Sequence, residues 1–250
     1  MFFYLLECYP DAQCSLKSKF CLFCIGNNKF MEQRYKYNQS KYPFGQLVSS
    51  LFEVPEHEMD NLHKRLPENI QYEALFTQQT DSSTWFHKKF YEKLNSGWPE
   101  FIDTYRNLVR EVVQPIMETE ELIFQKTPTF RVHLPGNLAV GAFHKDSGYN
   151  HQPNEINFII PLTEAFESNT MIVESEPGKM DFHQVEMHPG ELLRFHGSQC
   201  THGSLPNKTG KSRVSLDFRV LRPEEYDPEF DKKSMTKGIK FIVGGYYDRF

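Results

Sequence analysis

Residues 213–220 read Arg213-Val-Ser-Leu-Asp-Phe-Arg-Val220 and alternate polar and apolar side chains without a break. Successive side chains of a β-strand point to opposite faces of the sheet, so this alternation predicts a strand with one polar and one apolar face. The polar face carries Arg213, Ser215, Asp217 and Arg219, and the apolar face carries Val214, Leu216, Phe218 and Val220. The apolar face needs another layer to pack against, and the polar face lines a wet cavity or meets solvent.

The chain after residue 127 contains more segments of strand type. They are short, rich in apolar and β-branched residues, and separated by breaks that contain Pro, Gly or Asn. Together with the alternating segment they give eight predicted strands: 128–134, 138–144, 155–162, 170–174, 181–187, 191–196, 200–204 and 212–221. Eight short strands at this spacing are typical of a β-sandwich or a jelly roll.

The chain before residue 127 shows helical periodicity instead. Helices are predicted after Pro55 and after Thr84, and the strongest pattern follows Pro99, where apolar residues recur at three- and four-residue steps as far as Val113. Pro115 is expected to end or kink this helix because proline lacks a backbone donor. Helices followed by strands favour a mainly β protein with N-terminal helices. We expect a double-stranded β-helix of the jelly-roll, cupin-like type with the helices on its outside.

Composition narrows the class of protein. The 250 residues are 39% hydrophobic and carry a formal net charge of −5, which excludes a wholly disordered or collagen-like chain and argues against a general nucleic-acid binder. No apolar run approaches the roughly 20 residues that span a bilayer, so no membrane partner is expected. An odd count of five cysteines without a signal peptide favours reduced thiols and a cytoplasmic location.

Residues 1–30 are expected to be peripheral to the fold, and they contain Cys8, Cys14, Cys21 and Cys24. Cys21 and Cys24 have the spacing of a zinc or redox pair, but ordinary thiols are the simpler interpretation because no spacing rule completes the ligand set. The rest of the chain is predicted to contain a helical support region (31–126), a catalytic core (127–222) and a C-terminal extension (223–250). Residues 31–250 are expected to form one domain.

Three residues of the β half are candidate metal ligands. His144 and Asp146 stand two positions apart, so on a strand both point to one side. His202 follows 58 residues after His144, in the seventh predicted strand. Two histidines and a carboxylate can hold Fe(II) as a facial triad with three open positions, or Zn²⁺ in a hydrolase. A surface strand pair and a structural histidine are the alternatives without a metal.

Arg213 and Ser215 favour the iron alternative. They are neighbours on one strand face, where a guanidinium pairs with a carboxylate in a two-pronged fork and a hydroxyl adds a third hydrogen bond. This pair suits an acidic cosubstrate. The alternative is that Arg213 pairs with Asp217 on the same face.

In this order and at this spacing, His144-x-Asp146, His202 and Arg213-x-Ser215 resemble the Fe(II)/2-oxoglutarate-dependent oxygenases. Within that superfamily the chain looks most like the phytanoyl-CoA-dioxygenase-like enzymes, and closest to the branch named for a streptomycin-biosynthesis protein. The resemblance covers residues 127–221. Its closer part is carried by residues 132–137, 142–146, 154–157, 161–163 and 212–219.

The resemblance implies that His144, Asp146 and His202 bind Fe(II), and that Arg213 holds the distal carboxylate of 2-oxoglutarate with Ser215 beside it. It also implies a reaction with O₂ that releases succinate and CO₂ and hydroxylates an unactivated C–H bond of a small-molecule substrate. Related halogenases lack the carboxylate ligand, so the presence of Asp146 disfavours halogenation.

Four further polar residues are candidate contacts for small molecules. Asn157 lies in an apolar strand, so its amide is either hydrogen-bonded in the core or directed at the cosubstrate. Arg131 is a candidate substrate contact, or else it faces solvent. Tyr149 belongs to a loop that lies at the lip of the site or has no role in it. Arg219 binds a second anion or pairs with Asp217.

Two other functions use the same residues differently. A cupin-like metal-dependent hydrolase or isomerase would employ the triad with Zn²⁺ or Mn²⁺ and no 2-oxoglutarate, and Arg213-x-Ser215 is the feature against it. A non-catalytic β-sandwich binding module would bind no stoichiometric metal.

Overall fold

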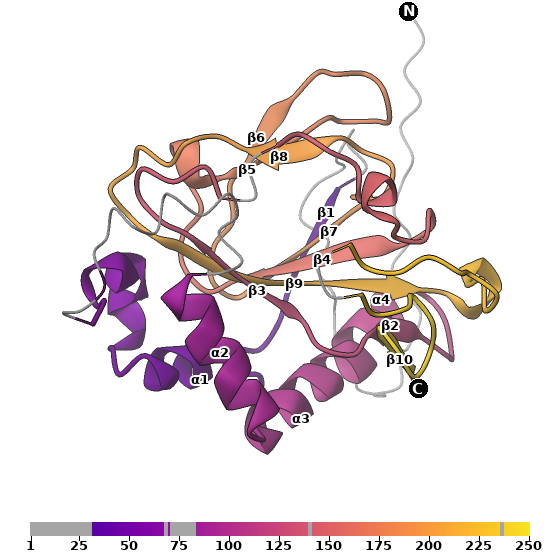
Figure 1. Cartoon of the computed structure of the whole chain (residues 1–250), viewed down its shortest axis with the longest axis horizontal. Coiled ribbons are helices and arrows are strands. Elements are labelled where there is room, and N and C mark those ends of the chain that lie inside the picture. Colours follow the sequence, from indigo (N-terminus) through magenta and orange to yellow (C-terminus); the bar gives the residue numbers. More distant parts are fainter. Residues whose placement is uncertain (1–31, 68–69, 71–83, 140–141, 236–237) are drawn as a thin grey trace, which may run out of the picture.

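The computed structural model describes residues 32–67, 70, 84–139, 142–235 and 238–250. Three layers lie on one another: a small sheet, a large sheet, and a group of helices against the outer face of the large sheet (Figure 1). The largest apolar core fills the space between the helices and the large sheet. A second core lies between the two sheets. The expected mainly β chain with helices from its N-terminal half is confirmed.

The large sheet has seven strands in the order β1-β7-β4-β9-β2-β10, with β3 also paired to β9. All of its strand pairs are antiparallel. Their bounds are β1 Gln33–Lys36, β2 Ile123–Gln125, β3 Thr129–His133, β4 Ile156–Pro161, β7 Glu191–Phe195, β9 Arg213–Leu221 and β10 Tyr247–Arg249. β9 is the longest strand and pairs with β4 along one edge and with β3 and β2 along the other.

The small sheet has three strands in the order β6-β5-β8: β6 His183–Val185, β5 Met171–Val173 and β8 His202–Ser204. His144 adds an isolated antiparallel bridge to His202 on β8. The segment that holds His144 therefore lies along the edge of β8 that does not pair with β5, although it forms no strand of its own. This bridge brings two candidate ligands together from distant parts of the chain.

The apolar face of β9 explains the layering. Val214, Leu216, Phe218 and Val220 are buried in the core against the helices. The alternate residues point the other way, into the space between the two sheets. Fully burying an apolar side chain of this size contributes about 1.5–3 kcal/mol, so these four residues alone fix which face of β9 meets the helices. The predicted two-faced strand is confirmed.

The helices of the N-terminal half are α1 Phe44–Leu51, a 3₁₀ helix Glu56–Lys64, α2 Trp85–Asn95, α3 Pro99–Leu108, a π-helical turn Val109–Val113 and α4 Gln114–Ile116. The 3₁₀ helix, α2 and α3 begin where the sequence predicts them, after Pro55, after Thr84 and at Pro99. The last helix ends one residue beyond Pro115, as the proline predicts. The N–H of Gln114 bonds to the carbonyl of Val109, five residues back, so the helix widens just before the residue that cannot donate.

Several sequence predictions need correction. The described residues of 138–144 form no strand, because the backbone of Ala139 is left-handed (φ 56°) and cannot continue an extended run. α1, β1, β2 and β10 were not predicted. The three short strands depend on long-range partners, for example β10 on β2.

Residues 1–30 with their four cysteines lie outside the described residues. Within the described part of the chain, no helix is long and apolar enough to cross a bilayer.

Two buried histidines make the fold sensitive to acid. Burial, together with the charge of Arg131, lowers the pKa of His87 from 6.5 to about 3. Burial, with the charge of Arg213, lowers the pKa of His133 from 6.5 to about 4. The unfolded chain therefore takes up these protons more readily. We expect the free energy of unfolding to be highest above pH 6.5, where both histidines are neutral in the folded and the unfolded chain. Between pH 6.5 and 4 it should fall by roughly 3 kcal/mol for each histidine.

Denaturant unfolding at a series of pH values measures this effect. Substituting His87→Phe should flatten the pH dependence, because phenylalanine has no titratable group. The new ring is expected to fit, since the His87 ring already packs against the ring of Phe130. His188→Gln provides the matched control, because it also removes an imidazole but from an exposed position. An unchanged slope in His87→Phe would contradict the assignment.

Candidate functional site

Three candidate ligands converge between the two sheets. The Nε2 atoms of His144 and His202 lie 3.5 and 3.6 Å from the same oxygen, Oδ1 of Asp146. One ligand atom from each residue lies within 4.8 Å of the others. His144 and His202 exchange two backbone hydrogen bonds of 2.9 Å, which fix the imidazoles side by side. The predicted triad is thus assembled in space.

Asp146 reaches this position by a different route from the expected one. It does not continue a strand from His144 but begins a 3₁₀ helix, Asp146–Tyr149. Its N–H donates to the carbonyl of Gly197 at 2.9 Å, which anchors the turn to the loop before β8. The chain folds back at this point, so the carboxylate faces both histidines while its backbone leaves the sheet.

Both imidazoles present the nitrogen that a metal requires. Nδ1 of His144 donates to the carbonyl of Ala142 at 2.7 Å, and Nδ1 of His202 donates to that of Cys200 at 3.1 Å. This tautomer leaves the Nε2 lone pairs directed at the space beside Asp146. Burial lowers the pKa of His202, so its imidazole is neutral and able to act as a ligand.

Asp146 is held as an ionised carboxylate from the other side. Its Oδ2 accepts hydrogen bonds from Asn157 Nδ2 at 2.7 Å and from Arg219 Nε at 2.8 Å. Burial alone would raise the pKa of Asp146, but the Arg219 charge and the contact with His144 hold that pKa well below its usual range. Oδ1 is left to face the histidines, so the donor set of two neutral imidazoles and one carboxylate fits a divalent metal.

Asn157 therefore contacts a candidate ligand, a role that the sequence did not predict. Its other amide atom, Oδ1, is buried and has no hydrogen-bond partner among the described residues. A Cβ on Gly197 would lie 2.7–2.8 Å from the Asn157 amide, so only glycine leaves room for this side chain. The free acceptor accords with a place for a donor in the cavity beside the triad.

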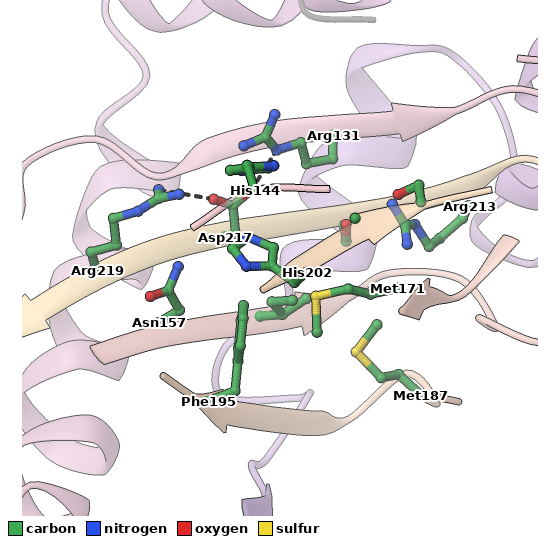
Figure 2. Close-up of a pocket in the computed structure, with 14 residues that line it drawn as sticks. Arg131, His144, Asn157, Met171, Met187, Phe195, His202, Arg213, Asp217 and Arg219 are labelled. Carbon is green, nitrogen blue, oxygen red and sulfur yellow. Dashed lines mark hydrogen bonds and ion pairs between the residues drawn. The ribbon is translucent and has the colours of Figure 1, made fainter. Parts of the chain in front are cut away.

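A cavity between the sheets contains the two histidines and the polar face of β9. Figure 2 shows Asn157 and Arg219 at one end and Arg213 at the other, with His144 and His202 between them. Its lining comes mainly from strands of both sheets: Arg131, His144, Asn157, Ile159, Met171, Met187, Phe195, His202, Gly203, Ser204, Arg213, Ser215, Asp217 and Arg219. The polar face of β9 therefore lines a cavity rather than meeting solvent.

Two arginines of this cavity, Arg131 and Arg219, form ion pairs with buried carboxylates. Asp217 accepts from Arg131 at 2.6 Å through one oxygen and from Arg219 at 3.2 Å through the other. Arg131 stands opposite Ser215 in the β3–β9 register, which directs it into the cavity. Arg219 also lies 3.6 Å from the buried Glu155, whose carboxylate accepts the hydroxyl of Tyr247 on β10. The two oxygens of Asp217 thus accept from Arg131 and from Arg219.

A comparison with known proteins finds a relative that is similar over most of the chain. No protein-family model matches the chain. The streptomycin biosynthesis protein StrG of Streptomyces griseus is 34% identical over 215 residues, which cover 86% of this chain and 96% of StrG. Identity of this extent over nearly the whole relative shows common descent. The chain belongs to the StrG family. This is the branch of the Fe(II)/2-oxoglutarate oxygenases that the motifs resemble, and that prediction is confirmed.

Solved structures resemble the StrG-family chain more distantly. AviO1 from Streptomyces viridochromogenes Tue57 is 12% identical, with 78% of this chain and 90% of AviO1 covered and a TM-score of 0.43. The epimerase SnoN from nogalamycin biosynthesis, described as non-haem and alpha-ketoglutarate dependent, is 14% identical, with coverage of 59% and 72% and a TM-score of 0.42. Likenesses of this strength carry no functional inference. The donor set of His144, Asp146 and His202 fits the predicted Fe(II), and the resemblance to the superfamily implies 2-oxoglutarate as the cosubstrate.

Some cavity residues of this StrG-family chain were missed by the sequence reasoning. Ser204 lines the cavity two positions after His202 on β8, so the period of the strand was a signal for it. Met171, Met187, Phe195 and Ile159 form an apolar part of the lining. Nothing in their own sequence context distinguishes these four from ordinary core residues.

Tyr149 lies beside the site rather than in the cavity lining. Its ring stands edge-on to His144 with a centroid distance of 4.8 Å, and 42% of the residue is exposed. In the StrG-family chain this tyrosine therefore covers the outer side of one candidate ligand. Its predicted contact with substrate stays a prediction.

Proposed function

We propose that this protein is a non-haem Fe(II)- and 2-oxoglutarate-dependent dioxygenase that hydroxylates an unactivated C–H bond of a small metabolite. The observation that carries the proposal is the pair of Nε2 atoms within 3.6 Å of one carboxylate oxygen, in the same cavity as Arg213 and Ser215. Membership of the StrG family supports it. The name of that relative, a streptomycin biosynthesis protein, favours a small metabolite over a macromolecule as substrate.

The strand order supports a double-stranded β-helix as the scaffold. From β3 onward the chain passes from the large sheet to the His144 bridge, back to β4, on to β5 and β6, and then through β7, β8 and β9. The large sheet thus contains the order β3-β9-β4-β7, and the small sheet extends from the His144 bridge through β8 and β5 to β6. This alternation between facing sheets is the winding of a jelly roll.

We assign the metal to His144, Asp146 and His202. The two imidazoles would bind through Nε2 and the carboxylate through Oδ1, while Asn157 and Arg219 hold Oδ2 away from the metal. A facial set of three protein ligands leaves positions open for a chelating cosubstrate and for O₂. When bound, Fe(II) with 2-oxoglutarate and O₂ supplies the oxidising chemistry that releases succinate and CO₂.

We assign the distal carboxylate of 2-oxoglutarate to Arg213, with Ser215 beside it. Both line the cavity on the same face of β9, and Ser204 on β8 adds a second hydroxyl to the lining. A guanidinium pairs with a carboxylate through two parallel hydrogen bonds, which suits the distal carboxylate of 2-oxoglutarate. Arg131 and Tyr149 are the residues that we assign to substrate contact. Arg219, also predicted there, already pairs with Asp146 and Asp217.

An anaerobic Fe(II) titration with and without 2-oxoglutarate tests the proposal. We expect a weak visible charge-transfer band that saturates near one equivalent of iron and requires 2-oxoglutarate. Bound metal without the band would favour a cupin-like hydrolase or isomerase. Absence of stoichiometric metal would favour a non-catalytic binding module. The cytoplasmic location stays a prediction.

A further inference from the structure

We propose that Glu174 is a positioning residue for the metal triad, joining the two backbone segments that carry the candidate ligands. The inference rests on the proposed function only in taking His144, Asp146 and His202 as ligands. Glu174 follows β5 directly and does not line the triad cavity. It lines a separate, smaller cavity with Cys200 and His183.

The Glu174 side chain is fully buried and surrounded by donors. Its Oε1 accepts the N–H of Thr201 at 2.6 Å. Its Oε2 accepts the N–H groups of Gly178 and Met180 at 3.0 and 3.1 Å. Burial would raise the pKa of Glu174, but these backbone donors lower it to about 2. The carboxylate is therefore ionised at neutral pH.

The first link runs to His202. Thr201 precedes this ligand, and Glu174 binds Thr201 twice, because the Glu174 N–H also donates to the Thr201 carbonyl at 3.0 Å. The pair extends the β5–β8 ladder, in which Val173 stands opposite His202, by one residue. The side-chain bond fixes the peptide that leads into β8, and with it the direction of the imidazole.

The second link runs to His144 and Asp146. Lys145, which stands between them, places Nζ 3.8 Å from Oε1 of Glu174. The turn that Gly178 and Met180 form leads to Phe182, whose ring packs edge-on against that of Phe143 at 5.0 Å. Phe143 precedes His144, so Glu174 braces the residues on either side of this ligand.

A carboxylate is the one side chain of this size that suits the position. Three N–H groups and an ammonium group converge on it, so both oxygens must accept and neither can donate. In Glu174→Gln the new NH₂ group would face donors, and one of the links would be lost. Residues that orient metal ligands through a second layer of contacts are worth about 10–100-fold in metal affinity.

The test compares Glu174→Gln with Glu176→Gln. Glu176 belongs to the same turn, but its side chain is 47% exposed and pairs only with the exposed Lys179 in the ion pairs of the described chain. Co(II) binding to the apo proteins gives the affinity, and the visible d–d spectrum of the Co(II) forms reports ligand geometry. Unfolding of the apo proteins separates ligand placement from loss of fold.

We expect Glu174→Gln to weaken Co(II) binding about 10–100-fold and to change the d–d spectrum, with Glu176→Gln like the wild type. Equal affinity and an unchanged spectrum in Glu174→Gln would overturn the inference and leave the proposed function intact. Failure of the wild type to bind Co(II) would overturn both. Should Glu174→Gln not fold, Lys145→Met decides: wild-type affinity and spectrum in that variant would overturn the inference.

Discussion

Replacing Asp146 with asparagine is expected to lower the affinity for Fe(II) by at least about 100-fold, since loss of a ligand exceeds the effect of residues behind the ligands. The structure gives a specific reason. Asn157 Nδ2 and Arg219 Nε both donate to Oδ2 of Asp146, so the introduced amide must turn its oxygen toward them. Its NH₂ group then faces the histidines, where it cannot bind a metal.

Two measurements check this prediction: anaerobic Fe(II) titration and succinate release from 2-oxoglutarate, which should fall to background. The apo variant should remain folded, because Arg219 keeps Asp217 and Glu155 as partners and the cost stays below the roughly 3–5 kcal/mol of an isolated buried charge. Asp60→Asn serves as the control, since Asp60 pairs with the half-exposed Lys211. Wild-type iron binding in the Asp146 variant would remove the triad from the mechanism.

Replacing Arg213 with methionine is expected to weaken 2-oxoglutarate binding by at least roughly 10–100-fold, because a hydrogen bond to a charged group contributes about 1.5–3 kcal/mol. Methionine keeps much of the length of the side chain and removes the charge and the fork. Iron affinity should not change, since Arg213 lies at the end of the cavity away from Asn157 and Arg219 (Figure 2). The 2-oxoglutarate dependence of the charge-transfer band at fixed iron gives the affinity.

A second cosubstrate sharpens the Arg213 test. 2-Oxovalerate has the carbon chain and the chelating end of 2-oxoglutarate but no distal carboxylate. The wild type should strongly prefer 2-oxoglutarate, and Arg213→Met should lose that preference because the group that recognises the carboxylate is gone. Preserved discrimination in the variant would assign the carboxylate to another residue of the cavity, with Arg131 as the first to examine.

The alternation of residues 213–220 is a local pattern, and it correctly predicted both faces of β9. Helix starts after Pro55, Thr84 and Pro99 were equally local, since they depend on capping and on apolar periodicity within one segment. Strands such as β1, β2 and β10 are three or four residues long and carry no comparable signal. They exist because a partner strand supplies their hydrogen bonds, and that partner lies far away in the sequence.

The candidate site divides in the same way. Ligand type and spacing placed His144, Asp146 and His202 together, and strand period placed Arg213 beside Ser215. Only the tertiary structure showed that Asp146 leaves the sheet in a 3₁₀ helix, that Asn157 and Arg219 hold its second oxygen, and that Glu174 binds the residue before His202. Periodicity tells which side chains share a face of one segment. Contacts between segments depend on where the chain returns, and a single sequence does not record that.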